Sequence, residues 1–173
     1  MTSPRHKVLI TTSGIGSRLG QLTEYTNKSL IVVGGKTVLA RIIESYPQDT
    51  NFVITLGYFG DHIRQFLKVA YPDRNFELVE VSPYRGPGSS LALSMYQAKD
   101  FLQCPFIYHA SDSILIDEKV PEPTLNWIAG QKSKDATNYA SFDVQFQDIT
   151  RFHEKGMVNF DYLHIGVIGI KDV

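Results

Sequence analysis

Two glycines and two basic side chains follow the first apolar run of this sequence, and together they are suited to holding a phosphate chain. The run Val8-Leu9-Ile10 leads into Thr-Thr-Ser-Gly-Ile-Gly at 11–16, and Arg18 and Lys28 come next. Glycines let a backbone turn tightly, so that successive N–H groups can surround an anion. Arg18 adds a planar fork of donors and Lys28 a point charge. The alternative is a plain tight turn with a solvated arginine, and the two basic residues favour the phosphate site.

Three common phosphate-binding loops can be compared with this stretch. No Gly-Lys-Ser/Thr follows, so it is not a Walker loop, and glycines at 14, 16 and 20 do not make Gly-x-Gly-x-x-Gly. The turn also resembles that of short-chain dehydrogenases, which need a Tyr-x-x-x-Lys pair far downstream. The nearest pair, Tyr25 and Lys28, lies within the loop itself, and Gly57 stands where an acidic residue would hold a ribose. Hydride transfer is therefore disfavoured.

Alternating strand and helix patterns predict where these residues lie. We expect strands at 7–12, 52–56, 76–81, 105–110, 139–145, 149–153 and 163–170, and helices at 37–46, 61–70, 89–102 and 124–131. This order predicts an α/β fold with a Rossmann-like, doubly wound, mostly parallel sheet. Such sheets bind ligands beyond the carboxyl ends of their strands. Asp112, which follows the fourth strand, should therefore share a crevice with the glycine loop.

Composition limits the classes of partner. The chain has 173 residues, 17 Lys+Arg and 18 Asp+Glu, for a net charge of −1. This balance argues against nucleic acid or a membrane surface as a partner, because both attract a basic excess. The single cysteine excludes an internal disulfide. No leader-like segment and no apolar run of the roughly 20 residues needed to span a bilayer is present, so we expect one cytoplasmic domain over 1–173.

The motifs around the loop resemble those of the sugar-phosphate nucleotidylyltransferases. The family pattern runs Gly-x-Gly-Ser/Thr-Arg-Leu/Met, then Pro-Leu-Thr, then Pro-Lys-x-Leu. The corresponding segments, in the same order, are Gly14-Ile15-Gly16-Ser17-Arg18-Leu19, Gln21-Leu22-Thr23 and Asn27-Lys28-Ser29-Leu30. Similar segments follow in family order at 33–39, 53–58, 85–93, 108–115 and 149–156. The resemblance implies a fold of the nucleotide-diphospho-sugar transferase type.

The same resemblance implies a reaction and a role for each residue. A phosphate oxygen of a sugar 1-phosphate, or of a phosphorylated alcohol, attacks the α-phosphorus of a nucleoside triphosphate, and pyrophosphate leaves. Arg18 would hold the β- and γ-phosphates, Lys28 would neutralise the α-phosphate, and Asp112 would hold Mg²⁺. The implied nucleotide-binding residues are Thr12, Ser13, Gly14, Gly16, Ser17, Gly57, Gly88 and Ser89. The implied acceptor-binding residues are Glu154, Lys155 and His164.

Some positions depart from the family pattern. Asn27 replaces the proline before the lysine, which predicts a looser loop, and His164 stands near a usual asparagine. The family's second metal carboxylate should lie further on, since Asp172 comes too early, so we expect the C-terminal part of the family fold to be lacking. A non-catalytic domain that senses nucleotides or nucleotide sugars is the alternative. The sequence leaves open the base, the acceptor and whether the chain forms a homo-oligomer.

Overall fold

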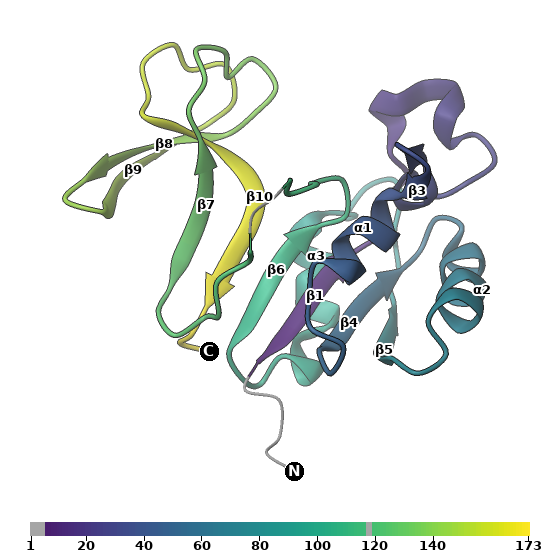
Figure 1. The fold of residues 1–173 in the computed structure, drawn as a ribbon. Helices are drawn as coiled ribbons and strands as arrows, with labels where there is room; N and C mark the ends of the chain where they lie inside the picture. The colour runs from purple at the N-terminus through teal and green to yellow at the C-terminus, as the bar shows by residue number, and fades with distance from the viewer. Residues whose placement is uncertain (1–5, 117–118) are drawn as a thin grey trace.

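The computed structural model describes residues 6–116 and 119–173, which form an eight-stranded sheet flanked by helices (Figure 1). The sheet strands are β1 Lys7–Thr11, β4 Asn51–Leu56, β5 Asn75–Glu80, β6 Phe106–Ala110, β7 Trp127–Gln131, β8 Ser141–Gln145, β9 Asp148–His153 and β10 Tyr162–Ile170. The α-helices are α1 Val38–Glu44, α2 Gly60–Ala70 and α3 Leu91–Gln97. Short 3-10 turns are η1 Ser17–Thr23, η2 Lys28–Leu30 and η3 Lys99–Phe101, and a small hairpin pairs β2 Val32–Val33 with β3 Lys36–Thr37.

Four strands in the order β5-β4-β1-β6 are parallel, and we call them the parallel half. Their carboxyl ends are level, because Thr11 of β1 pairs with both Thr55 and Ala110. The loops after β1, β4 and β6 therefore emerge at one edge. The predicted α/β class with a Rossmann-like sheet is confirmed.

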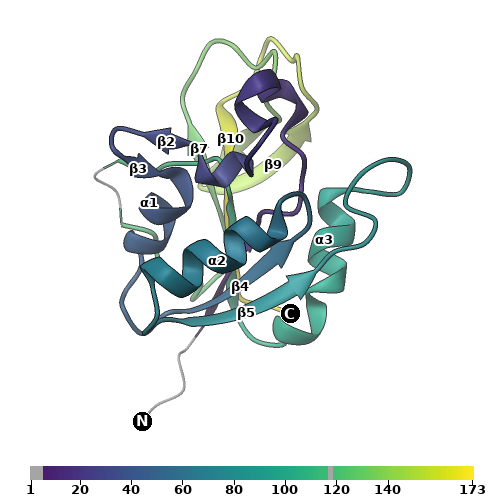
Figure 2. The ribbon, with the colours of Figure 1, turned by 90° about the vertical axis from the view of Figure 1, so that its right-hand side faces the viewer.

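Helices cover both faces of the parallel half, as Figure 2 shows with α1 and α2 on one side and α3 on the other. Val8 and Ile10 of β1 pack in the cluster that includes α1 and α2, whereas Leu9 packs in the cluster around α3. A strand alternates its side chains between faces, so an unbroken apolar run is needed where both faces are buried. Two predicted helices begin at hydroxyl caps, because Thr37 accepts a hydrogen bond from the Ala40 amide and Ser90 from the Leu93 amide.

Strands β7 to β10 form an antiparallel half. Along one edge β10 pairs first with β8, through Tyr162 and Leu163, and then with β6, through Val167 to Ile170. Strand β7 pairs along the other edge. The register of β10 against β7 shifts between His164 and Ile168, the part of β10 in which its partner on the opposite edge changes from β8 to β6.

The helix predicted at 124–131 is wrong, because this segment contains strand β7. Its apolar residues could belong to either a helix or a strand, and the free edge of β10 decides in favour of the strand. Trp127 covers Gly169 of β10, where an added Cβ would lie 2.2 Å from the indole. Within the described ranges, no helix is long and apolar enough to cross a membrane.

Candidate active site

A cleft of about 400 Å³ opens at the carboxyl ends of β1 and β6. The glycine loop, the segment before α3 and the turn after β6 form its walls. The lining residues are Thr11, Ser13, Gly14, Ile15, Arg18, Lys28, Pro83, Tyr84, Ser89, Ser90, Leu91, Ser94, Tyr108, Ala110, Ser111 and Asp112. Lys28 and Asp112, which are 84 residues apart in the sequence, thus meet at the edge that the strand order predicts.

The glycine loop is fixed to the neighbouring strand. The carbonyl of Ser13 accepts a hydrogen bond from the Tyr58 amide at 3.0 Å. Gly57 permits this approach, because a Cβ there would lie 2.6 Å from the Ser13 carbonyl oxygen and 2.7 Å from the Tyr84 Cβ. Gly16 has a φ of 67°, in the left-handed region that favours glycine. The glycines therefore serve tight turning and close backbone contact.

Asn27 holds the far end of the same loop, contrary to the prediction of a looser loop. Its side chain is fully buried, and its amide nitrogen donates to the carbonyls of Thr12 and Tyr58, both at 2.7 Å. Its amide oxygen accepts from the Ser29 amide at 3.0 Å and from the Ser29 hydroxyl at 2.7 Å. A buried side-chain amide that forms four hydrogen bonds holds the loop in one conformation.

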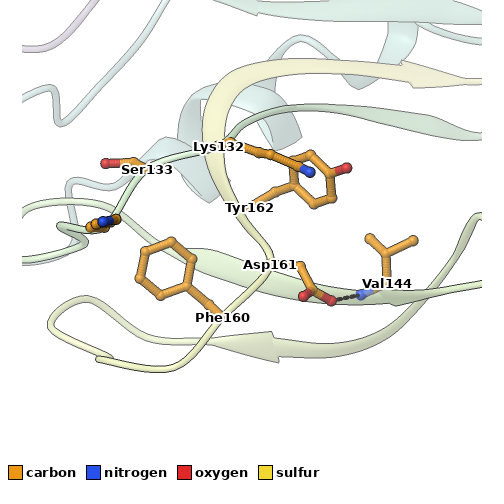
Figure 3. A pocket seen from close by; sticks show the side chains of 7 residues that line it. Lys132, Ser133, Val144, Phe160, Asp161 and Tyr162 are labelled. Atoms are coloured by element: carbon orange, nitrogen blue, oxygen red, sulfur yellow. Dashed lines mark hydrogen bonds between the residues drawn. The ribbon is translucent and has the colours of Figure 1, made fainter.

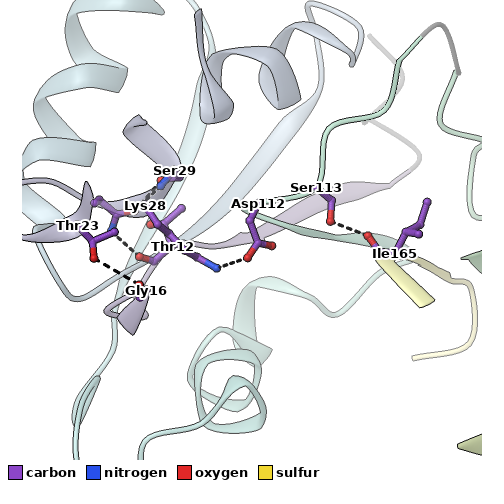
Figure 4. A network of polar contacts seen from close by, with 9 residues as sticks. Thr12, Gly16, Thr23, Lys28, Ser29, Asp112, Ser113 and Ile165 are labelled. Carbon is purple, nitrogen blue, oxygen red and sulfur yellow. Dashed lines mark hydrogen bonds and ion pairs between the residues drawn. The ribbon is translucent and has the colours of Figure 1, made fainter. Parts of the chain in front are cut away.

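Lys28 and Asp112 meet across the cleft, with Nζ and Oδ2 2.8 Å apart (Figure 4). The lysine side chain is 20% exposed and the aspartate side chain 58% exposed, so the pair is accessible to a ligand. The stem of Lys28 passes Gly16, where an added Cβ would lie 3.1 Å from the lysine Cβ. The arrangement presents one cation and one carboxylate in direct contact with each other at the cleft.

The other predicted nucleotide residues differ in placement. Ser13, Gly14 and Ser89 line the cleft with the exposed Arg18, and no ion pair of residues 6–116 and 119–173 involves that arginine. The Thr12 hydroxyl is buried and donates to the Thr55 carbonyl at 2.6 Å. The remaining three do not line the cleft: Ser17 faces a neighbouring hollow, Gly57 lies beneath the loop, and Gly88 has a φ of 87° in the segment before α3.

The predicted acceptor residues lie in the antiparallel half and do not line this cleft. Glu154 and Lys155 are exposed after β9, and His164 is half-buried in β10, where burial lowers its pKa. A separate hollow of about 620 Å³ lies in the same half (Figure 3). It is lined by Lys132, Ser133, Lys134, Val144, Phe160, Asp161 and Tyr162. None of the three acceptor residues lines the cleft with Arg18, Lys28 and Asp112, although His164 directly precedes Ile165, whose carbonyl accepts a hydrogen bond from Ser113 beside Asp112.

One junction joins the turn that holds Asp112 to the antiparallel half. The Ser113 hydroxyl donates to the Ile165 carbonyl at 2.6 Å, as Figure 4 shows. Gly166 has a φ of 79°, and an added Cβ there would lie 2.7 Å from the Ala110 Cβ. The sequence pattern did not reveal Ser113 or Gly166, and it singled out Asn27 only as a residue that would loosen the loop. For Asn27 the available signal was its place directly before the lysine.

The donor set at Asp112 suits a magnesium ion that is shared with a phosphate chain. Within the described part of the chain, no cluster of three or more His, Cys, Asp or Glu side chains could hold a metal ion alone. Magnesium needs only one or two protein carboxylates when phosphates and waters complete its shell. Among the described residues, Lys28 is the one hydrogen-bond partner of the Asp112 side chain and engages Oδ2, so the exposed carboxylate retains oxygens for such an ion.

No protein-family model matches the sequence. A curated protein, the bifunctional IPC transferase and DIPP synthase of Aquifex aeolicus (strain VF5), is 36% identical over 110 residues. That match covers 61% of this chain, and the chain spans only 24% of that protein's length.

Solved nucleotidyltransferase structures share the fold. A UDP-glucose pyrophosphorylase complexed with UDP-glucose has a TM-score of 0.80 at 14% identity, with 97% of this chain and 76% of that chain covered. The inositol-1-phosphate CTP transferase from T. maritima has a TM-score of 0.72 at 15% identity, covering 98% and 71%. The CTP:phosphocholine cytidylyltransferase from Streptococcus pneumoniae has a TM-score of 0.72 at 23% identity, covering 98% and 72%. The predicted resemblance to the sugar-phosphate nucleotidylyltransferases is therefore confirmed in fold by the three solved structures, and the curated transferase matches part of the chain in sequence.

Proposed function

We propose that this chain is a nucleotidylyltransferase that joins a nucleoside triphosphate to a phosphorylated sugar or alcohol. A phosphate oxygen of the acceptor forms a bond to the α-phosphorus, the bond from that phosphorus to the bridging oxygen breaks, and pyrophosphate leaves with the electron pair. The observation that carries the proposal is the meeting of Lys28 and Asp112 beside the glycine loop, in a cleft that Arg18 also lines. Little covalent help is needed for such a transfer, so alignment and charge neutralisation suffice.

Each side chain has a role that its position supports. Arg18, with no ion pair among the described residues, would turn toward the β- and γ-phosphates and stabilise the leaving pyrophosphate. Lys28 would leave Asp112 for an α-phosphate oxygen, because the triphosphate as a whole carries more negative charge than one carboxylate. Backbone groups of Ser13 and Gly14 would line the triphosphate, and Ser89 would lie nearer the base.

Magnesium and the acceptor complete the proposal. Asp112, released by Lys28, would hold Mg²⁺, and the bound ion would supply neutralisation of the phosphate charges. Glu154, Lys155 and His164 would bind the acceptor, so they would act from the antiparallel half. A cytoplasmic location remains a prediction of the sequence.

The first test is thermal melting with ATP, GTP, CTP, UTP and dTTP, each with and without Mg²⁺. A ligand at about 100 times its dissociation constant adds roughly 2.7 kcal/mol of stability, which a shifted melt would report. Pyrophosphate release is then measured with sugar 1-phosphates, inositol 1-phosphate and phosphocholine. CTP is the first nucleotide to test, because two of the solved structures bear the names of transferases that use CTP.

The two measurements separate the enzyme from a sensor. Magnesium-dependent release of pyrophosphate with one nucleotide would support the enzyme and identify its base. A shifted melt without release from any acceptor would favour a nucleotide-sensing domain. If no nucleotide shifts the melt and no pyrophosphate is released, the glycine loop is only a structural turn.

A further inference from the structure

Asn27 forms more hydrogen bonds to this chain than its place in the phosphate-binding motif requires. The family motif has a proline there, which has no side-chain donor. The φ of Asn27 is −71°, close to the angle that a proline ring imposes, so the backbone here matches what a proline would give. The amide therefore adds four hydrogen bonds to a backbone that already has the required course.

The partners of Asn27 belong to the walls of the cleft. Thr12 directly follows β1, Tyr58 follows β4, and Ser29 lies in η2 immediately beyond Lys28. The Tyr58 hydroxyl also donates to the Thr23 carbonyl at 3.0 Å, which fixes the middle of the same loop. One buried amide thus links the ends of two parallel strands to Ser29, the residue immediately after Lys28.

We infer that Asn27 is a positioning residue that aims Lys28 into the cleft through these four hydrogen bonds. This inference rests on the proposed function, because Lys28 is the group that would contact the α-phosphate. Asn27 itself is fully buried and does not line the cleft, so it acts through Lys28 and does not touch a ligand. Small displacements of an aligned charge are costly, since a misplacement of about 1 Å can slow a reaction about 10²-fold.

The test compares Asn27→Ala and Asn27→Pro with the unchanged protein. Both variants lack the amide, and the proline variant keeps the backbone angle. We expect kcat for pyrophosphate release to fall about 10²-fold in both, with KM for the nucleotide within about threefold. Ile43→Val, a core change in α1 away from the cleft, serves as the control for lost stability. A loss of kcat no greater than in a control of equal melting temperature, or full activity in Asn27→Pro, would overturn the inference.

A second measurement isolates the link to Lys28. If Asn27 acts only through Lys28, the double variant Asn27→Ala/Lys28→Ala should be no slower than Lys28→Ala alone, whereas independent roles would multiply the two losses. In ligand-free protein, acetylation of Lys28 by acetic anhydride, read by mass spectrometry, should rise in Asn27→Ala toward its rate in Asp112→Ala.

The acetylation of Lys28 distinguishes a failure of the proposed function from a failure of the positioning inference. Absence of pyrophosphate release from the unchanged protein would count against the proposed function. Unchanged labelling of Lys28 in Asn27→Ala would count against the positioning role, whether or not the protein is active.

Discussion

The parallel half and the antiparallel half of the sheet differ in how firmly their loops are held. At the ends of β1 and β4, buried amide and hydroxyl groups of Asn27 and Thr12 fasten the loop to neighbouring carbonyls. In the antiparallel half, β9 is mostly exposed, and apolar side chains such as Phe146 and Val158 are 91% and 82% exposed. A rigid edge suits groups that must align a triphosphate, whereas exposed loops can vary with the acceptor.

The largest expected effect comes from removing a charge at the rigid edge. Arg18→Ala or Asp112→Ala should lower turnover at least about 10³-fold, because Arg18 would offset charge on the leaving pyrophosphate and Asp112 would hold the magnesium ion that does the same. The melting temperature should hardly change, since exposed ion pairs contribute about 0–1 kcal/mol. Lys36→Ala, which breaks the exposed Lys36–Glu44 pair at 2.5 Å, is the matched control. Retained turnover in either cleft variant would contradict the proposal that this cleft is the active site.

A methyl group at Gly57 should damage both activity and stability. The added Cβ would lie 2.6 Å from the Ser13 carbonyl oxygen, so the glycine loop would have to shift. We expect nucleotide affinity to fall about tenfold or more and the free energy of unfolding to fall by about 1–3 kcal/mol. Titration calorimetry and urea unfolding check the two effects. Gly14→Ala, where nothing lies within 4 Å of the new Cβ, is the control for stability, and equal melts for both variants would contradict the steric account.

The corresponding change in the antiparallel half is Gly169→Ala, and it should affect stability alone. Its Cβ would lie 2.2 Å from Trp127, so the indole of β7 could no longer pack against β10. We expect a loss of about 1–3 kcal/mol of unfolding free energy in urea, with unchanged nucleotide affinity. In Gly169→Ala/Trp127→Ala the two losses should be less than additive. Additive losses would show that Gly169 is not required by its contact with the Trp127 indole.

The sequence predicted the parallel half more fully than the antiparallel half, and burial explains why. Runs such as Val8 to Ile10 are apolar because both faces of the sheet are covered, and their ends locate the glycine loop, Lys28 and Asp112. Segment 124–131 was mistaken for a helix, because only its pairing with β10 decides its form. The role of Asn27 depends on carbonyls 15 and 31 residues away, which local patterns do not reveal.

A smaller effect should separate the halves by substrate. If Lys155 binds the acceptor phosphate, Lys155→Ala should raise KM for the acceptor about tenfold, the equivalent of roughly 1.4 kcal/mol, and leave nucleotide binding unchanged. Initial rates at varied acceptor and fixed nucleotide measure this. Lys68→Ala on α2 provides a matched loss of an exposed lysine in the parallel half. A weaker nucleotide affinity in Lys155→Ala would mean that the antiparallel half also contacts the triphosphate.

The smallest expected effect concerns pH at the border between the halves. His109 in β6 is buried, with the Tyr46 hydroxyl 2.8 Å from Nδ1 and the Ser113 carbonyl 3.0 Å from Nε2. The neutral ring satisfies both partners by accepting at Nδ1 and donating from Nε2. Burial lowers the pKa of His109, and the hydrogen bond to Ser113 opposes this shift in part.

The direction in which stability changes with pH follows from whether the folded or the unfolded state binds the proton at the higher pH. An unfolded histidine titrates near its ordinary pKa of about 6.5, above the value in the folded chain, so acid favours unfolding. Stability is therefore full above about pH 7 and declines as the pH falls through about 6.5. Burial also lowers the pKa values of His6 and His164, which adds to the decline. Urea unfolding at several pH values should give a shallower decline for His109→Gln than for the unchanged protein or for His62→Gln, whose histidine is exposed on α2. Equal slopes in all three would mean that this contact beside the Asp112 turn keeps its strength when the ring is protonated.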